Sequence, residues 1–237
     1  MNDSNAGKNQ IEIQNFYDRT YYSTLPNSLT PRRYDLRLAR RLNIDLHSDV
    51  LDIACGTGEW LRAVAELGGK VSGIDLSTRA IEFCQMQMPT GVFKQGNAEV
   101  LPFENDKFNI ITCLGSLEHF LAPEKALKEM IRVSSADCKF LLLVPNSGFL
   151  TKRLGLFGGT HQQDAYEHWR SIEEWESLFE SVGLEVKVKW KDLHVLSWKW
   201  VSMKGWASVP TRFLQAVLLC VWPLRWQYQV YFLCAQS

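Results

Sequence analysis

The sequence predicts an α/β fold built on a doubly wound, mostly parallel sheet. Short apolar runs that suit buried strands alternate with helical patterns between residues 50 and 190. A glycine-containing turn at 55–58 joins the first of these runs directly to a helix, and a last apolar run at 228–235 ends the chain. With 237 residues, we expect a single enlarged domain over 1–237.

The N-terminal region is predicted to contain a tail and two helices. Residues 1–10 are small and polar, so we expect them to be disordered. N-terminal helices are expected within 11–46, where Ile13, Phe16 and Tyr17 follow helical spacing and Pro31 begins a second helix that runs over 32–46.

The remaining elements follow in regular order. The predicted strands are 50–54, 71–74, 92–96, 108–114, 139–144, 184–190 and 228–235. The predicted helices are 59–67, 78–88, 123–133 and 171–182. Pro123 starts the third of these helices, and Ser171 and Glu174 form a capping box for the fourth. A cofactor-binding core is expected over 47–145.

Residues 50–60, VLDIACGTGEW, indicate a βαβ unit that binds a nucleoside. Gly56 and Gly58 leave the backbone bare where the strand turns into a helix, and the N–H groups of a helix N-terminus are unpaired. Asp75 lies 23 residues after Asp52, at the end of the second strand, where a carboxylate can accept two hydrogen bonds from a ribose diol. A dinucleotide-binding fingerprint would need a third glycine near position 61, where this chain has Leu61, so these residues do not match that fingerprint.

Four motifs in order resemble the class I S-adenosylmethionine (SAM) methyltransferases. They are the pattern D-x-x-x-G-x-G from Asp52, then GIDLS (73–77), GNAEVLPF (96–103), and FNIITC (108–113) with LEHF (117–120). The variant with L-P-F and L-E-H is most similar to the group that methylates small molecules, lipids and sugars. Two positions depart from the family: Ala54 replaces a frequent glycine, and Asn97 stands where aspartate is usual.

The resemblance implies a seven-stranded sheet whose last strand is antiparallel, with SAM as cofactor and S-adenosylhomocysteine as product. The positions that match the family's cofactor contacts fall into three groups. The methionine part would lie along Asp52, Ala54, Gly56 and Gly58. Asp75 would take the ribose, with Leu76, Asn97 and Ala98 around the adenine and Leu114 facing the cofactor.

Several polar residues are candidates for the acceptor side. His119 follows the fourth strand on the edge where open α/β sheets bind ligands, and it is the best candidate for a general base; alternatively, it caps and packs the following turn. The resemblance makes 146–170 an acceptor-site loop, with His161 and His168 as further catalytic candidates and Gln162, Gln163 and Tyr166 as substrate contacts. Alternatively, residues 146–170 form a polar surface loop without a role in binding. Tyr17, Tyr21 and Tyr22 would line the site or simply pack their helix.

Composition limits the class of partner. Lys and Arg number 26 and Asp and Glu number 26, so no global field favours nucleic acid. The six cysteines show no zinc spacing, so we expect no metal and reduced thiols in a cytoplasmic protein. Arg32 to Arg41 include five arginines, which we interpret as a solvated basic face.

An aromatic insertion is predicted over 192–227, before the last strand. Five of the nine tryptophans fall here among four cations, and 213–222 is apolar almost all round. Residues 196–226 would form a peripheral membrane contact, cover an apolar acceptor pocket, or pack back on the sheet. Ten residues are too few to cross a bilayer.

The sequence is therefore interpreted as a SAM-dependent methyltransferase that acts on an oxygen of a small-molecule, lipid or sugar acceptor. An RNA or protein methyltransferase and a catalytically silent SAM-binding scaffold are the alternatives. The neutral charge and the missing N-P-P-[YF]-type tetrapeptide after the fifth strand argue against the first of these alternatives. N- and C-methylation, and every oligomeric state, stay open.

Overall fold

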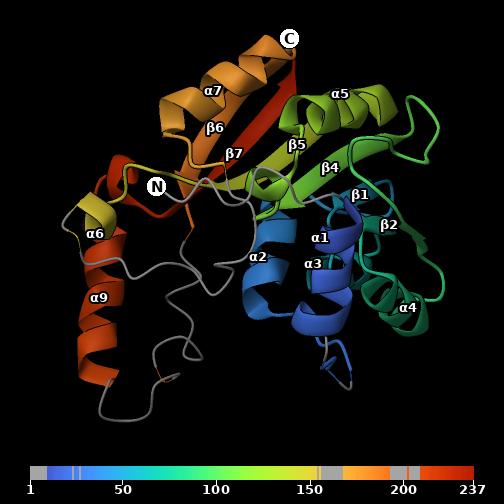
Figure 1. Ribbon diagram of the computed structural model, residues 1–237, viewed down its shortest axis with the longest axis horizontal. Coiled ribbons are helices and arrows are strands. Elements are labelled where there is room, and N and C mark those ends of the chain that lie inside the picture. Colours follow the sequence, from blue (N-terminus) through green and yellow to red (C-terminus); the bar gives the residue numbers. More distant parts are fainter. Residues whose placement is uncertain are drawn as a thin grey trace.

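A seven-stranded sheet forms the centre of the protein in the computed structural model (Figure 1). The structure describes residues 10–22, 24–26, 28–153, 155, 168–192, 202 and 209–237. The strand order is β3-β2-β1-β4-β5-β7-β6. β7 pairs antiparallel with both β5 and β6, and the other pairings are parallel. The predicted doubly wound sheet with an antiparallel last strand is confirmed.

The strands and helices have the following bounds. The strands are β1 Asp49–Ile53, β2 Lys70–Asp75, β3 Val92–Gln95, β4 Phe108–Leu114, β5 Ser134–Pro145, β6 Leu184–Lys191 and β7 Gln229–Gln236. The α-helices are α1 Gln10–Phe16, α2 Arg33–Arg41, α3 Glu59–Glu66, α4 Thr78–Gln87, α5 Pro123–Val133, α6 Leu150–Arg153, α7 Ile172–Ser181 and α9 Val209–Val221. The π-helix η1 is Tyr17–Tyr21, and two 3-10 turns are η2 Leu117–His119 and η5 Leu224–Trp226.

Two helical layers enclose the sheet. Helices α2, α3 and α4 bury their apolar stripes against one face, whereas α5 and α7 cover the other (Figure 1). α5 begins at Pro123 and ends at Val133 as predicted. The predicted capping box also forms, with Ser171 and Glu174 each accepting a backbone N–H at the start of α7.

Two element boundaries differ from the sequence prediction. α2 ends at Arg41 rather than at residue 46, because the chain leaves the helix at Leu42 and Asn43 takes a left-handed φ of 60°. β5 begins at Ser134, five residues before the predicted start. The first residues of β5 are mostly polar, so no apolar run marks this part of the strand. A register shift also interrupts the pairing of these residues with β4.

The C-terminal insertion is described only in part. α9 and η5 stand between β6 and β7, while residues 193–201 and 203–208 lie outside the described part of the chain. No helix among the described residues is both long enough and apolar enough to cross a membrane.

The register places the ends of three central strands side by side. Ile53, the last residue of β1, pairs with Ile74 in β2 and with Cys113 in β4. The residues that follow these strands therefore converge on one edge of the sheet, where open α/β sheets bind ligands.

Ala54 begins the turn after β1 and differs from its prediction. It was expected to continue the strand, but it has a φ of 57° and lies beyond the strand's end at Ile53. A left-handed backbone brings the Cβ of an L-residue too close to the carbonyl oxygen that follows, which costs roughly 1–2 kcal/mol. This conformation accounts for the frequent glycine that the resembled family has at this position.

We therefore expect Ala54→Gly to raise the free energy of unfolding by about 0.5–1 kcal/mol, since relief of the strain outweighs the added freedom of glycine in the unfolded chain. Urea unfolding at fixed pH measures the change. A loss of stability larger than about 0.5 kcal/mol would contradict this account of the turn.

Candidate functional site

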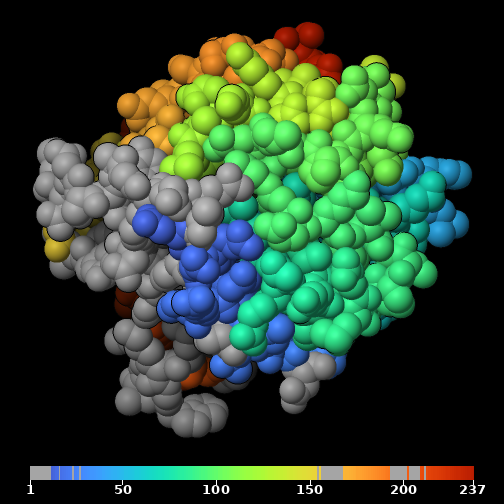
Figure 2. Space-filling model, turned by 45° about the vertical axis from the view of Figure 1, so that its right-hand side comes forward, coloured from blue at the N-terminus to red at the C-terminus, as the bar shows by residue number. Residues whose placement is uncertain are grey.

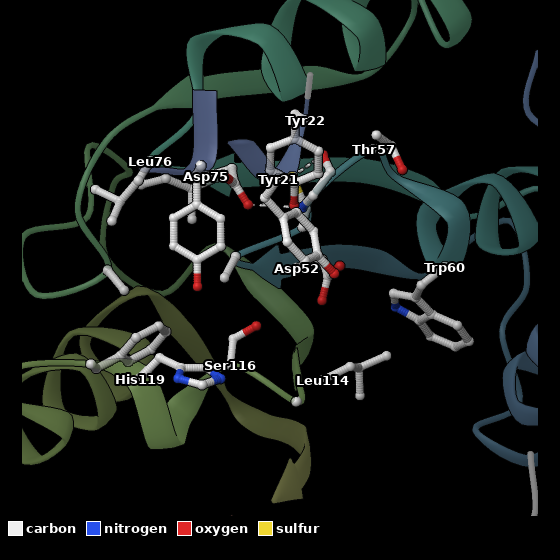
Figure 3. A pocket seen from close by; sticks show the side chains of 18 of the residues that line it. Tyr21, Tyr22, Asp52, Thr57, Trp60, Asp75, Leu76, Leu114, Ser116 and His119 are labelled. Carbon is white, nitrogen blue, oxygen red and sulfur yellow. Dashed lines mark hydrogen bonds between the residues drawn. The ribbon is translucent and has the colours of Figure 1, made fainter. Parts of the chain in front are cut away.

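A cavity of about 390 Å³ opens at the carboxyl ends of β1, β2 and β4. Tyr21 and Tyr22 of the N-terminal segment lie on one side of it, and Leu114, Ser116 and His119 lie on the other (Figure 3). Most of the predicted cofactor residues line this cavity: Asp52, Ala54, Gly56, Asp75, Leu76, Asn97, Ala98 and Leu114. Segments far apart in the sequence therefore meet at one site.

The turn after β1 passes close to its neighbours. Gly56 has a φ of 53°, and a Cβ there would lie 2.8 Å from the hydroxyl oxygen of Tyr22. Gly58 has a φ of 77°, and a Cβ there would lie 2.9 Å from Cys84 Sγ in α4. Gly58 is not among the residues that line the cavity. The second glycine therefore serves the packing of α3 against α4, and the predicted cofactor contact is left to Gly56.

Asp75 joins the end of β2 to this turn. Its Oδ2 accepts the Gly56 N–H at 2.9 Å, and its Oδ1 accepts the Ser77 N–H at 2.8 Å. Burial raises the pKa of Asp75, while these two N–H donors act in the opposite direction. Each carboxylate oxygen keeps a second lone pair, so the group can still accept hydrogen bonds from two ribose hydroxyls.

Asp52 lies deeper, inside β1. The β1–β4 register pairs it with Thr112, whose hydroxyl donates a 2.5 Å hydrogen bond to Asp52 Oδ1. Burial is the main cause that raises the pKa of Asp52 to about 8, against the effect of the Thr112 hydrogen bond. The buried carboxyl is therefore mostly protonated at neutral pH, and a nearby cation would favour its ionised form.

The predicted adenine region gathers Leu76, Asn97 and Ala98 at one end of the cavity. Asn97 Oδ1 accepts the Glu99 N–H at 2.9 Å, which fixes the direction of its amide. A carbonyl oxygen has two lone pairs, so Asn97 Oδ1 can also accept from an exocyclic amine. The replacement of the family's aspartate by an amide is compatible with adenine binding.

Trp60 and Arg32 line the cavity and were missed by the sequence analysis. Trp60 is 4% exposed, and its Nε1 has no hydrogen-bond partner within the described part of the chain. That nitrogen is on the side of the ring that faces the cavity (Figure 3). Arg32, which was assigned to a solvated face, contacts Glu59 at 2.8 Å and Asp35 at 2.6 Å. A buried donor without a partner indicates that a ligand completes this part of the site.

The N-terminal segment forms a cover of aromatic rings. Tyr21 packs edge-to-face with Tyr17 at 5.6 Å and with Tyr22 at 4.9 Å between ring centroids. Asp18 of η1 accepts a 2.5 Å hydrogen bond from the Ser77 hydroxyl at the start of α4. In Figure 2 the blue N-terminal segment lies against the surface coloured teal to green. The burial of Tyr22 and the charge of Asp75 both raise the pKa of the Tyr22 hydroxyl, which therefore stays protonated.

Of the two candidate catalytic histidines that the structure describes, His119 lines the cavity and His168 does not. His119 lines the cavity with Ser116 and Phe120. His168 does not line it; its backbone N–H donates to the Glu118 carbonyl at 2.7 Å, and burial lowers the pKa of its imidazole. The acceptor-loop residues His161, Gln162, Gln163 and Tyr166 lie outside the described residues. His119 is thus the candidate base that the described cavity supports.

No group of His, Cys, Asp and Glu within the described ranges could hold a metal ion. The cavity instead offers a carboxylate at the end of β2, an unpartnered indole N–H, and a buried carboxyl that favours a cation. These groups fit the ribose, carboxylate and ammonium of an adenosyl amino acid. We therefore expect Asp75 to hold the ribose, Trp60 to reach the carboxylate and Asp52 to face the ammonium.

This arrangement predicts how pH changes the affinity for S-adenosylhomocysteine. Below pH 8, both Asp52 and the ligand amine carry a proton, whereas the bound pair holds only one. The affinity should rise up to tenfold per pH unit towards pH 8 and fall at the higher pH where the ligand amine loses its proton. Calorimetry in buffers of different ionisation enthalpy should detect release of a proton at pH 6.5.

The variant Asp52→Asn should lose the rise below pH 8 and keep the fall above it, because only the ligand amine still titrates. A wild-type affinity that is flat between pH 6 and 8 would contradict the protonated Asp52. The native state also holds a proton that the unfolded chain has lost, so the free energy of unfolding without ligand should fall as pH rises from about 4 to 8.

Comparison with known proteins gives the family. The family described as "Methyltransferase domain" matches residues 50–137. The uncharacterized methyltransferase YcgJ of Bacillus subtilis is 30% identical over 166 residues, which cover 66% of this chain and 65% of that protein. A demethylmenaquinone methyltransferase of Lactiplantibacillus plantarum is 25% identical over 185 residues, or 66% of this chain and 78% of the relative.

A third relative, a ubiquinone biosynthesis O-methyltransferase of Paraburkholderia phytofirmans, is 34% identical over 122 residues, or 47% of this chain and 53% of that protein. The crystal structure of the Bacillus subtilis YcgJ protein aligns with a TM-score of 0.56 and 22% identity, over 86% of this chain and 95% of that one. It shows the shared fold. With the sheet order and the domain match, these likenesses place the chain in the class I SAM-dependent methyltransferases.

Proposed function

We propose that this protein transfers the methyl group of SAM to a hydroxyl oxygen of a small, ring-containing acceptor. The observation that carries the proposal is the wall of the cavity, which combines three tyrosines and Phe120 with the imidazole of His119. Aromatic walls favour flat apolar ligands through stacked and edge-to-face contacts. A histidine beside such a ligand is suited to take a proton from its hydroxyl.

The chemistry requires little beyond alignment and one proton transfer. SAM supplies a methyl group on a positively charged sulfur. The acceptor oxygen forms a bond to that methyl as the methyl–sulfur bond breaks, and the hydroxyl proton passes to the His119 imidazole. Holding the two reactants in line can supply about 7–11 kcal/mol of the barrier. The protein's main task is therefore to position the acceptor under the tyrosine cover.

The relatives support a ring acceptor. Two of them are named for demethylmenaquinone and for ubiquinone biosynthesis, and the second is named an O-methyltransferase. Both names refer to quinone compounds, so a quinol-type ring is the acceptor class that we favour within the proposal. Phe120 and the tyrosines would contact the faces of such a ring.

A second candidate is methyl transfer to a ring carbon, since the name of the demethylmenaquinone relative, unlike that of the ubiquinone relative, does not specify oxygen. A carbon acceptor also loses a proton, so His119 would keep its role. An RNA or protein substrate has less support, because the described cavity is small and the charges of the chain balance.

The proposal is tested by turnover of methyl-labelled SAM with matched acceptors. A catechol or short-chain quinol should be methylated at oxygen, while a monosaccharide, a fatty acid, bulk RNA and a basic protein should not. Methylation of a ring carbon, read by mass spectrometry and NMR, would favour the second candidate. Binding of S-adenosylhomocysteine without turnover on any acceptor would identify a silent scaffold and contradict the proposal.

His119→Asn should lower kcat for the phenolic acceptor about 10²–10⁴-fold, since the base is lost while the side chain keeps a similar size. The affinity for S-adenosylhomocysteine should change less than about twofold. His47→Asn is the matched control: His47 is exposed between α2 and β1, at the opposite edge of the sheet, and should keep full activity. A kcat for His119→Asn within threefold of the wild-type value would remove His119 from the mechanism.

A further inference from the structure

α9 exposes an apolar face that nothing within the described part of the chain covers. Five large apolar residues of this 13-residue helix are exposed, from 45% for Val217 and Leu218 to 75% for Val221: Phe213, Leu214, Val217, Leu218 and Val221. At 100° per residue they span an arc of about 140°. Soluble monomers rarely expose so continuous an apolar surface unless it binds something. We call these five residues the α9 face.

The opposite side of α9 is anchored to the sheet. Ala216 is 2% exposed. Gln227 Nε2 donates to the Leu219 carbonyl at 2.6 Å, and Lys191 Nζ donates to the Cys220 carbonyl at 2.8 Å. The positive charge of Lys191 at the C-terminal end of α9 also interacts favourably with the helix dipole. The helix therefore has a defined inner side, and the α9 face points away from the protein.

The surroundings of the α9 face carry positive charge. Residues 142–153 and 209–237 contain Lys152, Arg153, Arg212 and Arg225 and no acidic side chain. Arg153 lies close to Asn146, because an added Cβ at Gly148 would be 3.2 Å from Arg153 Nη2 and 3.3 Å from Asn146 Oδ1. The Asn146 amide in turn donates to the Arg225 carbonyl at 2.9 Å. α6, which carries Lys152 and Arg153, stands on the same side of the molecule as α9 (Figure 1).

The end of α9 is rich in tryptophan. Trp222 follows the helix and Trp226 ends η5, and both are half-buried. The Arg225 guanidinium lies 5.6 Å from the ring centroid of Trp226. Tryptophan and arginine together favour the boundary between water and a lipid layer, where one end of the side chain is apolar and the other is hydrated.

We propose that the α9 face inserts into an anionic lipid surface, with α9 lying parallel to the membrane plane. A helix of this length spans about 20 Å and is too short to cross the apolar layer, but it can bury its apolar face at the level of the headgroups. The flanking cations supply the attraction to anionic headgroups. The four cations without an acidic side chain in residues 142–153 and 209–237 match the charge of an anionic lipid surface.

The α9 face is linked to the cavity through the start of β7, and the lipid proposal holds whichever acceptor is methylated. α9 precedes Gln229, the first residue of β7, and an added Cβ at Gly115 would lie 3.6 Å from Gln229 Nε2. Gly115 itself lines the cavity. The chain that leads from α9 into β7 and the cofactor cavity thus lie at one edge of the sheet.

Vesicle co-sedimentation of the full chain tests the proposal. Wild-type protein should sediment with vesicles of phosphatidylcholine and phosphatidylglycerol, more weakly with pure phosphatidylcholine, and less in high salt. The double variant Val217→Asp/Val221→Asp should lower the partition coefficient at least tenfold, because it places two charges in the apolar arc. Arg225→Gln should lower it about fivefold on anionic vesicles only.

The matched control is Leu46→Asp, which changes an apolar side chain that is 74% exposed at the opposite edge of the sheet and should leave sedimentation unchanged. Circular dichroism and S-adenosylhomocysteine affinity check that each variant folds. No wild-type sedimentation with either vesicle, or equal sedimentation of the α9 double variant, would overturn the proposal. A wild-type dimer that the double variant converts to monomer would assign the α9 face to a second copy and overturn it too.

Discussion

The hydrogen bond from the Gly56 N–H to the Asp75 carboxylate is the constraint on which the site depends. It fastens the turn after β1 to the end of β2, so that the bare backbone and the Asp75 carboxyl group, our candidate for the ribose, lie at a fixed separation. The parallel pairing of Ile53 with Ile74 brings the ends of the two strands to the same edge of the sheet. Left-handed φ values at Ala54, Gly56 and Gly58 shape the turn that leads from β1 into α3. The Cys55 N–H donates to the Ile74 carbonyl at 3.0 Å, so a backbone bond joins the same turn to β2 beside the carboxylate.

Around this bond, the cavity holds two carboxyl groups with different hydrogen-bond partners. Asp75 is stabilised by two N–H donors, whereas Asp52 is buried beside a single hydroxyl and has a raised pKa of about 8. The first suits neutral hydroxyls and the second suits a cation. The tyrosine cover, held to α4 through Asp18, lies over one side of the cavity, and His119 lies on the other. On this view, one sheet edge carries cofactor, acceptor and lipid contacts together.

Much of the fold could be predicted from the sequence, because the spacing of apolar residues in strands and helices is a local pattern. The turn after β1 could also be recognised from its two glycines. The cofactor positions followed from motif resemblance, and the cavity gathers all of them except Gly58. Trp60 was hidden because it reads as a core residue of an amphipathic helix, and Thr112 because its role depends on the β1–β4 register. Arg32 reaches the cavity only through the tertiary position of α2, which no local pattern reveals.

Titration calorimetry of S-adenosylhomocysteine at pH 8 tests the central claim most directly. We predict one binding site in the wild-type protein and an affinity about 10- to 100-fold lower in Asp75→Asn, because the amide replaces one acceptor oxygen with an N–H donor and leaves a hydrogen-bond partner unsatisfied. Trp60→Phe should weaken binding about tenfold, while Trp190→Phe, whose ring packs on Tyr231 and is not among the cavity residues, should not. No heat of binding at millimolar ligand, or equal affinity in Asp75→Asn, would contradict the account.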